Sequence, residues 1–178
     1  GSGRQGTAAA YDIVRFGSPS KLTIIDNNED NLKRCESIIK KLTDFEIDKL
    51  VLDIQDKEKI LLALKDVDIF LSSVPYPLNP YLTDIAIESK THMVDLGGHT
   101  QNVIKQIERS SEAKDAGITI VPDCGMGPGM NVSMALLSME DFDVVKEVRV
   151  WDGGLPLKPT PPWNYNLFFN IEGLTNEY

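Results

Sequence analysis

The sequence predicts an α/β fold built on a doubly wound parallel sheet. Short apolar runs of strand length alternate with segments whose apolar residues recur about every 3.6 positions, as in parallel sheets covered by helices. A glycine pattern from Gly1 to Gly6 opens the chain, and Asp26 ends an apolar run twenty residues later. Together these observations favour a dinucleotide-binding sheet of the Rossmann type.

The first elements follow directly from the glycine pattern. A helix is expected over 5–16, where small and apolar residues precede the helix-breaking segment Gly17 to Ser20. The run Lys21 to Ile25 predicts a strand. Residues 31–42 predict a second helix because their apolar positions share one face. Two shorter patterns then predict a strand over 50–53 and a helix over 57–64.

The same alternation continues to residue 139. The apolar run 67–74 predicts a strand buried on both faces, since parallel strands between helix layers are apolar throughout. The hydrophobic periodicity predicts the remaining elements in the same way. These are helices over 81–89, 103–116 and 131–139, and strands over 92–95 and 118–121.

The pattern changes after Asp143. Residues 148–151 and 167–171 are strand candidates, joined by a segment rich in proline and glycine. About thirty residues cannot build a separate core, so residues 1–143 are expected to form a nucleotide-binding domain and residues 144–178 to begin a second, truncated α/β domain. In dinucleotide-binding folds the glycines follow a strand, so the first strand is expected to be absent from the chain.

Composition and charge favour a small-molecule ligand. The chain has 178 residues, of which 42% are hydrophobic, and 18 basic against 27 acidic side chains give a net charge of −9. This charge argues against nucleic acid or an anionic membrane as the main partner. No apolar run approaches the roughly 18 residues of a membrane span, and no cluster has metal-ligand spacing. The two isolated cysteines, Cys35 and Cys124, do not make a disulfide framework, so we expect a cytoplasmic protein.

The glycine pattern carries the cofactor hypothesis. Gly1 permits the tight turn, Gly3 lets the backbone approach a pyrophosphate, and Gly6 lets the helix pack on its strand. Asp26 stands where a carboxylate accepts hydrogen bonds from ribose hydroxyls, and no basic residue follows closely to receive a 2′-phosphate. NAD is therefore expected rather than NADP, although Asp26 could instead cap the next helix or end a strand. The expected cofactor contacts in this part of the chain are Gly1, Gly3, Arg4, Gln5, Gly6 and Asp26.

Further candidates follow the ends of predicted strands, which meet at one edge of a parallel sheet. Asp53 is expected near the adenine ring, and Ser73, Val74 and Pro75 along the nicotinamide half. The alternatives are a solvated loop position for Asp53 and a simple end of the strand at Pro75.

A second glycine-rich turn, residues 121–130, lies between a predicted strand and helix. Pro128 near the first helical turn is expected to leave unpaired backbone amides, which would bind a substrate carboxylate. Gly125 and Gly129 are the candidates for that site, with Asp123 and Cys124 beside the reacting carbon. The alternative is a tight turn that needs glycines for backbone reasons, with Cys124 as a small buried side chain.

Asp95 and His99 are the better placed candidates for proton transfer. Asp95 ends the predicted strand 92–95 and His99 follows it at the carboxyl edge of the sheet. Tyr76, which follows Pro75, could line the same cleft. A solvated His99 and a packing role for Tyr76 are the alternatives.

Several motifs together resemble the saccharopine dehydrogenase family, and most closely its lysine 6-dehydrogenase group. The resemblance implies a nicotinamide domain joined to an α/β catalytic and oligomerisation domain, and a homo-oligomer, a dimer, for the full-length protein. It also implies hydride transfer between the cofactor and the amine-bearing carbon of a lysine-derived substrate. The motifs are Gly1 to Gly6, Ser73 to Pro77, Asp95 to Gly98, Pro122 to Gly129, Gly153 to Pro156 and Asn170 to Tyr178.

Carried onto this sequence, the resemblance places Tyr76, Asp95, Cys124 and the turn through Gly129 in the active-site cleft, with Glu172 approaching from the second domain. Asp95, His99 and Cys124 are then the candidates for removing the amine proton. An NAD-dependent dehydrogenase acting on lysine or a lysine adduct is expected. The alternatives are an NADP-linked saccharopine or carboxynorspermidine dehydrogenase, and a nucleotide-sensing domain without turnover.

Overall fold

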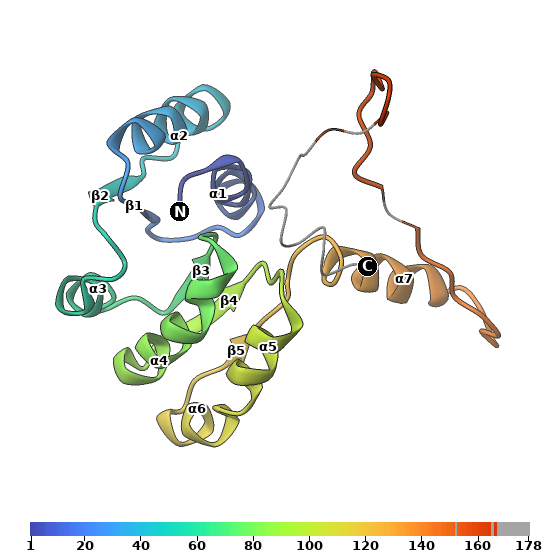
Figure 1. Ribbon diagram of the computed structural model, residues 1–178. Helices are drawn as coiled ribbons and strands as arrows, with labels where there is room; N and C mark the ends of the chain where they lie inside the picture. Colours follow the sequence, from blue (N-terminus) through green and yellow to red (C-terminus); the bar gives the residue numbers. More distant parts are fainter. Residues whose placement is uncertain (152, 165, 167–178) are drawn as a thin grey trace.

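The computed structural model describes residues 1–151, 153–164 and 166. Strands and helices alternate along the chain up to residue 139 (Figure 1). The strands are β1 (Thr23–Asp26), β2 (Asp48–Val51), β3 (Ile69–Ser72), β4 (His92–Asp95) and β5 (Ile120–Val121). The helices are α1 (Arg4–Phe16), α2 (Glu29–Leu42), α3 (Lys57–Ala63), α4 (Asn79–Ser89), α5 (Thr100–Ile107), α6 (Ser110–Ala116) and α7 (Met130–Met139), with a 3-10 turn η1 (Tyr76–Leu78) before α4.

All pairs of these strands are parallel, which confirms the predicted kind of sheet. β1 pairs with β2, and β3, β4 and β5 form a second sheet in that order. Helices connect the paired strands, as parallel pairing requires. Because the strands of each sheet run in one direction, their carboxyl ends share an edge, and the loops that follow carry most of the predicted site residues.

The first two residues join the two sheets at this edge. The carbonyl of Gly1 accepts a hydrogen bond from the Ser73 hydroxyl, just beyond β3, at 2.9 Å. The amide of Ser2 donates to the carboxylate of Asp26, at the end of β1, at 2.6 Å. The N-terminus therefore lies between the ends of β1 and β3 (Figure 1). The expectation that a strand precedes Gly1 and is absent from this chain stays a prediction.

Three clusters of apolar side chains hold the helices on the sheets. One joins α1, β1 and α2 around Cys35, which is fully buried. Another joins α4, β4 and α6 around Met93. In the third, Ile25 of β1 and Phe70 of β3 both pack against the group that contains Ile85 of α4, so this cluster bridges the two sheets. Removing apolar surface from water is the main term that stabilises such an arrangement.

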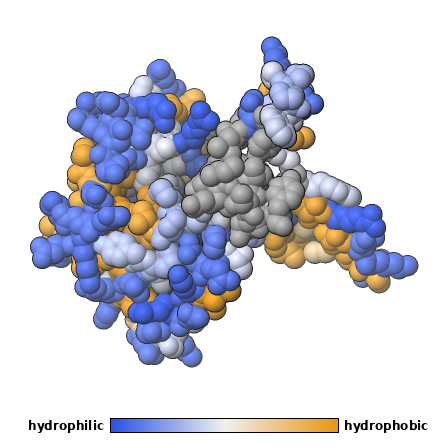
Figure 2. Space-filling view, viewed as in Figure 1, coloured by the Kyte–Doolittle hydropathy of each residue, from blue (hydrophilic) through white to orange (hydrophobic). Residues whose placement is uncertain are grey.

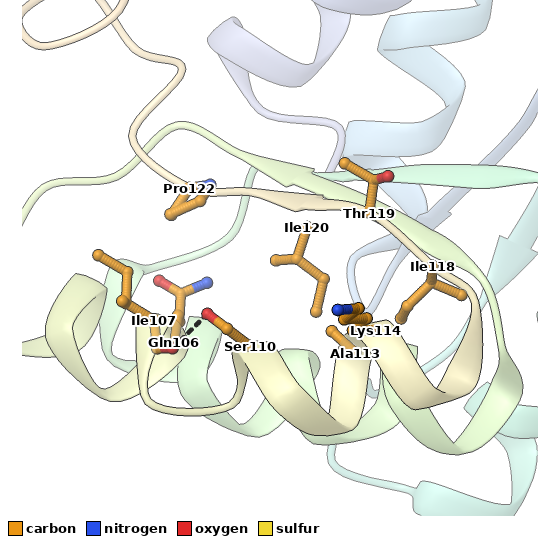
Figure 3. A pocket seen from close by; sticks show the side chains of 9 residues that line it. All are labelled: Gln106, Ile107, Ser110, Ala113, Lys114, Ile118, Thr119, Ile120 and Pro122. Atoms are coloured by element: carbon orange, nitrogen blue, oxygen red, sulfur yellow. Dashed lines mark hydrogen bonds between the residues drawn. The ribbon is translucent and has the colours of Figure 1, made fainter.

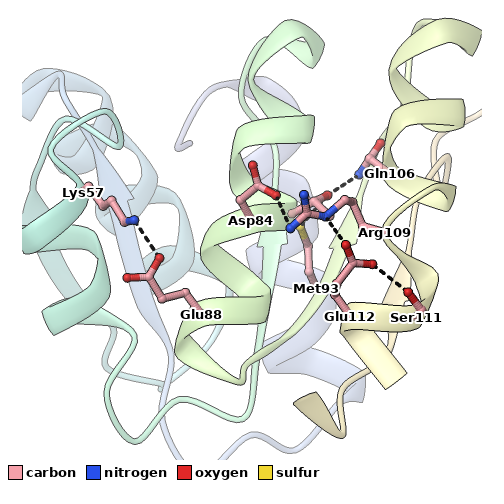
Figure 4. Close-up of polar contacts among 9 residues, drawn as sticks. Lys57, Asp84, Glu88, Met93, Gln106, Arg109, Ser111 and Glu112 are labelled. Carbon is pink, nitrogen blue, oxygen red and sulfur yellow. Dashed lines mark hydrogen bonds and ion pairs between the residues drawn. The ribbon is translucent and has the colours of Figure 1, made fainter. Parts of the chain in front are cut away.

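Ion pairs tie neighbouring helices at the surface (Figure 4). Lys57 of α3 pairs with Glu88 of α4 at 2.7 Å. Arg109, between α5 and α6, contacts Asp84 of α4 at 3.2 Å and Glu112 of α6 at 3.4 Å. All five side chains are partly exposed, so each pair contributes only about 0–1 kcal/mol to stability.

Every strand and helical segment predicted up to residue 139 is present, but the 3-10 turn η1 was not predicted and several boundaries differ. Two of these differences have a clear physical cause. The strand expected over 50–53 lies at Asp48–Val51, because β2 pairs with β1 from Thr23 to Asp26 and ends where β1 ends. The single helix expected over 103–116 is two helices, α5 and α6. The hydroxyl of Ser110 donates to the carbonyl of Ile107, a local bond that competes with the helical ladder.

Two further predictions are wrong. β3 is not buried on both faces: Ile69 is 56% exposed, because β3 borders its sheet and pairs only with β4 among the described strands. Residues 148–151 are not a strand, since they pair with no strand among the described residues. Trp151 is 81% exposed. The expected strand 167–171 lies outside the described residues, and the domain boundary at residue 143 stays a prediction.

The surface of α7 is apolar. Figure 2 shows hydrophobic residues gathered over this helix, at the right of the view. Within the described residues, no helix combines the length and the apolar character needed to cross a membrane. The exposed apolar side chains of α7 are Met130, Val132, Met134, Leu136 and Leu137.

Candidate active site

The glycine turn leads into α1 and leaves the start of that helix open. Gly3 is the N-cap residue, and within the described residues no side chain caps the helix. A Cβ added to Gly3 would meet no described atom within 4 Å, whereas one added to Gly6 would lie 2.1 Å from the Gly1 carbonyl oxygen. The first amides of a helix lack intrahelical partners, so this open turn fits a phosphate group. Arg4 and Gln5 are exposed beside it.

Asp26 lies at the end of β1, where the sequence places it, but the chain itself engages its carboxylate. Oδ2 accepts hydrogen bonds from the Ser2 amide at 2.6 Å and the Ser2 hydroxyl at 2.8 Å, and Oδ1 accepts one from the Asn28 amide at 2.8 Å. Partial burial acts to raise the pKa of Asp26, but the bonds from Ser2 and Asn28 outweigh it and lower the pKa below its ordinary value. Asp26 thus fixes the glycine turn on β1, while Asn28 caps α2.

The loop after β3 lies against the glycine turn. The Ser73 hydroxyl bonds to Gly1, Val74 packs against the cluster around Met93, and Pro75 is exposed. Asp53 is farther along the edge, two residues beyond β2. It is exposed, and its Oδ1 accepts the amide of Gln55 at 2.9 Å, which matches the loop role of the alternative interpretation.

The loops after β3, β4 and β5 place Tyr76, His99, Asp123 and Cys124 at one edge, and we call these four residues the rim. The rings of Tyr76 and His99 stack, with centroids 5.7 Å apart and planes 14° from parallel. A Cβ on Gly98 would lie 2.9 Å from Cδ1 of Tyr76, so this close approach requires glycine. The Nδ1 atom of His99 is buried and has no hydrogen-bond partner among the described residues.

Asp123 and Cys124 both have raised pKa values. Partial shielding from water is the main cause for each, even though the Cys124 side chain is exposed. The nearby negative charge of Asp95 acts in the same direction, while the Gly98 amide opposes the rise for Asp123. A thiol with a raised pKa is protonated near neutral pH, so Cys124 is a weak nucleophile. Asp123 is better suited to exchange a proton. The catalytic role of Cys124 stays a prediction.

Asp95 is fully buried beneath the rim. Its Oδ1 accepts the amides of Gly97 at 2.7 Å and Asp123 at 3.3 Å, and its Oδ2 accepts the side-chain amide of Gln106 at 2.7 Å. The carboxylate therefore faces protein donors, and its expected role in proton transfer stays a prediction. Sequence reasoning missed Gln106, because a single glutamine on an amphipathic helix forms no recognisable pattern.

The turn before α7 does not offer the open amides expected of it. The amide of Met130 donates to the Gly125 carbonyl at 2.8 Å, and that of Asn131 to the Met126 carbonyl at 3.0 Å. Gly129 has a φ of +129°, and a Cβ there would lie 2.3 Å from the Gly125 carbonyl oxygen. These two amides are therefore not free to bind a substrate carboxylate, whereas the substrate contacts expected at Gly125 and Gly129 stay predictions.

A groove of about 370 Å³ lies between β5 and the helices α5 and α6 (Figure 3). Most of the side chains that line it are apolar, and Lys114 is the one charged residue among them. This lining brings no set of titratable groups together, so the groove is a poor candidate for the chemistry. The remaining substrate candidate, Glu172, lies outside the described residues.

Comparison with known proteins decides the family. Residues 1–121 match the family described as "Saccharopine dehydrogenase NADP binding domain". The chain belongs to this family. Alpha-aminoadipic semialdehyde synthase, mitochondrial, from Bos taurus is 32% identical over 57% of this chain and 11% of that protein. Saccharopine dehydrogenase (NADP(+), L-glutamate-forming) from Saccharomyces cerevisiae is 28% identical over 59% of this chain and 24% of that protein.

A solved structure supports the fold of this saccharopine dehydrogenase family member. Apo histidine-tagged saccharopine dehydrogenase (L-Glu forming) from Saccharomyces cerevisiae matches with a TM-score of 0.62 at 22% identity, over 79% of this chain and 29% of that one. The chain thus spans between about a tenth and three-tenths of these relatives. The doubly wound α/β fold and the family resemblance are confirmed.

The cofactor prediction is wrong. Asp26 led to the expectation of NAD, but the matching family is NADP-binding, and the yeast relative and one from Pyricularia oryzae are named as NADP(+) enzymes. The physical reason lies in the contacts of Asp26. Its carboxylate is occupied by Ser2, so it indicates how the glycine turn is held rather than which ribose is bound. These relatives carry saccharopine or aminoadipic semialdehyde in their names rather than lysine 6-dehydrogenase.

Proposed function

We propose that the complete protein is an NADP-linked dehydrogenase that oxidises saccharopine and releases L-glutamate. The carrying observation is the hydrogen bond between Gly1 and Ser73, which sets the open start of α1 beside the loop that leads to Tyr76. The glycine turn would hold the pyrophosphate, and the rim would face the nicotinamide and the substrate. The family and the names of the yeast and Pyricularia relatives support this substrate and cofactor.

The reaction is the oxidation of a carbon–nitrogen bond. NADP⁺ supplies the hydride acceptor when it is bound. Release of glutamate requires the bridging nitrogen to stay with the glutamate part, so the hydride leaves the lysine-derived carbon and water then cleaves the imine. Saccharopine, NADP⁺ and water give L-glutamate, aminoadipic semialdehyde, NADPH and a proton.

Each rim residue has a part in this chemistry. The stacked rings of Tyr76 and His99 offer a flat surface against which the substrate can pack. Asp123, whose pKa is raised mainly by burial, can take up the amine proton and return it during cleavage of the imine. Cys124 lines the site as a neutral thiol.

The direct test is a spectrophotometric assay of the full-length protein. Saccharopine and L-lysine are offered separately, each with NADP⁺ and with NAD⁺. We expect NADPH to form with saccharopine and not with lysine. Turnover of lysine alone would instead support the lysine 6-dehydrogenase reading, and tight NADPH binding without any turnover would support a nucleotide-sensing domain.

A further inference from the structure

A chain of buried polar side chains runs from α4 through α5 to the rim. Thr83 and Asp95 are fully buried, and Gln106 is 4% exposed. The Nε2 atom of Gln106 donates to Oγ1 of Thr83 at 3.0 Å and to Oδ2 of Asp95 at 2.7 Å. Figure 4 shows Gln106 extending from α5 toward α4. Gln106 therefore connects a helix position to the carboxylate beneath the rim.

The carboxylate of Asp95 ties together two loops that come from different strands. Its Oδ1 holds the amide of Gly97, after β4, and the amide of Asp123, after β5. Its backbone carbonyl also accepts the amide of Cys124 at 2.8 Å. A buried carboxylate is costly unless donors surround it, so the bond from Gln106 both stabilises the charge and fixes the direction of Oδ1.

Both loops need such an anchor. Gly97 has a φ of +69° and Asp123 a φ of +60°, both in the left-handed region. For Asp123, which has a Cβ, this conformation is strained and persists only where the surroundings enforce it. The bonds to Asp95 supply that enforcement.

We propose that Gln106 is a positioning residue: its amide orients the Asp95 carboxylate, which then fixes the loops that carry His99 and Cys124. The importance of these loops for catalysis rests on the proposed function, whereas the hydrogen-bond network does not. Gln106 touches no reacting atom and acts through Asp95.

The test compares five variants of the full-length protein with the wild type, one of them the single variant Asp95→Asn. Gln106→Met keeps the length of the side chain and removes the amide, and Gln101→Met is the matched control at an exposed position of the same helix. Thr83→Val is milder, because it leaves the bond from Gln106 to Asp95 in place and removes the second acceptor of Gln106 and a weak contact to Sδ of Met93. The double variant D95N/Q106E reverses the bond, so that an amide at position 95 donates to a carboxylate at position 106.

The first readout is steady-state kinetics. We expect Gln106→Met to lower kcat/KM by on the order of tenfold through misplaced rim residues, with a smaller loss for Thr83→Val. Gln101→Met should stay within about twofold of the wild type. D95N/Q106E should recover activity relative to Asp95→Asn alone, which a loss of general stability does not predict.

The second readout does not require turnover. Cys124 is exposed and Cys35 is buried, so the rate at which iodoacetamide modifies the Cys124 peptide, followed by mass spectrometry, reports on the loop after β5. We expect severalfold faster modification in Gln106→Met. In Asp95→Asn the midpoint of the pH dependence of Cys124 modification should move to lower pH. The substitution removes one negative charge near the thiol, while that of Asp123 remains.

Wild-type kinetics and wild-type modification in both Gln106→Met and Thr83→Val would overturn the proposal. If Gln106→Met fails to fold, Thr83→Val and the double variant decide the question. A wild-type protein without turnover of saccharopine would refute the proposed function alone, since the modification rates still test the network.

Discussion

Several side chains at the sheet edge form hydrogen bonds within the chain rather than facing solvent. Asp26 is the clearest case, since its two carboxylate oxygens accept three hydrogen bonds, from Ser2 and Asn28. These bonds lower its pKa despite partial burial. Charged acceptors form stronger hydrogen bonds than neutral ones, so the glycine turn depends on this carboxylate being ionised.

Asp26→Asn should therefore weaken the fold at neutral pH and remove part of its acid sensitivity. The folded-state pKa lies below the ordinary 3.8, so the contribution of Asp26 is present above about pH 4 and is lost as pH falls through the folded value. The measurement is urea unfolding at about pH 7 and about pH 3, where the wild type should lose more stability than the variant. Asp44→Asn, at an exposed position, is the control. Equal losses in wild type and Asp26→Asn would contradict this account of the turn.

The sequence reveals which residues stand at the sheet edge, but not what they bond to. Spacing placed Asp26 at the end of a strand, and Tyr76, His99 and Cys124 in the loops after strands, as the structure has them. Spacing could not show that the Ser2 amide and hydroxyl donate hydrogen bonds to the Asp26 carboxylate, which is why the cofactor was mispredicted. Gln106 could not be found at all, because its partner Asp95 becomes its neighbour only through folding.

At the scale of elements, the link between the glycine turn and α1 controls the proposed cofactor site. The turn is tight at Gly6, where any Cβ would strike the Gly1 carbonyl, and open at Gly3. Hydrophobic patterning, together with the glycine turn for α1, predicted most of the elements. It misplaced β2, because pairing with β1 sets where that strand lies. It also missed the break between α5 and α6, where the Ser110 hydroxyl bonds to the Ile107 carbonyl.

Gly6→Ala and Gly3→Ala should separate folding from cofactor binding. In Gly6→Ala the new Cβ would lie 2.1 Å from a carbonyl oxygen, so both thermal stability and NADPH affinity should fall. In Gly3→Ala stability should be retained, while the Cβ fills the space where a pyrophosphate is proposed to approach. NADPH fluorescence titration and thermal unfolding measure the two effects, with Gly153→Ala as the neutral control. Unchanged NADPH affinity in Gly3→Ala would argue against this turn as the cofactor site.

At the scale of the whole molecule, the two sheets meet through the cluster around Ile85 and through the first two residues. A cofactor on the glycine turn would bind at this junction. The exposed apolar side chains of α7 lie on a helix that is apart from the N-terminus (Figure 1). The parallel arrangement of strands and helices could be predicted from their alternation along the chain. The division into two sheets could not, because it depends on which strands pair.

NADPH should stabilise the full-length protein more than NADH. A ligand that binds only the folded state adds about 2.7 kcal/mol at a concentration of 100 times its Kd, which raises Tm by several degrees. Thermal scans at equal NADPH and NADH concentrations measure the difference. A larger shift with NADH would contradict the assignment to NADP.

The most direct measurement of the proposed reaction is the transfer of deuterium. Saccharopine with both hydrogens on the lysine-derived carbon next to the bridging nitrogen replaced by deuterium is incubated with the full-length protein and NADP⁺. The NADPH is analysed by mass spectrometry. Direct hydride transfer predicts one deuterium in each NADPH molecule, with a slower rate than for unlabelled substrate where this step limits turnover. NADPH without deuterium, formed together with glutamate, would contradict it.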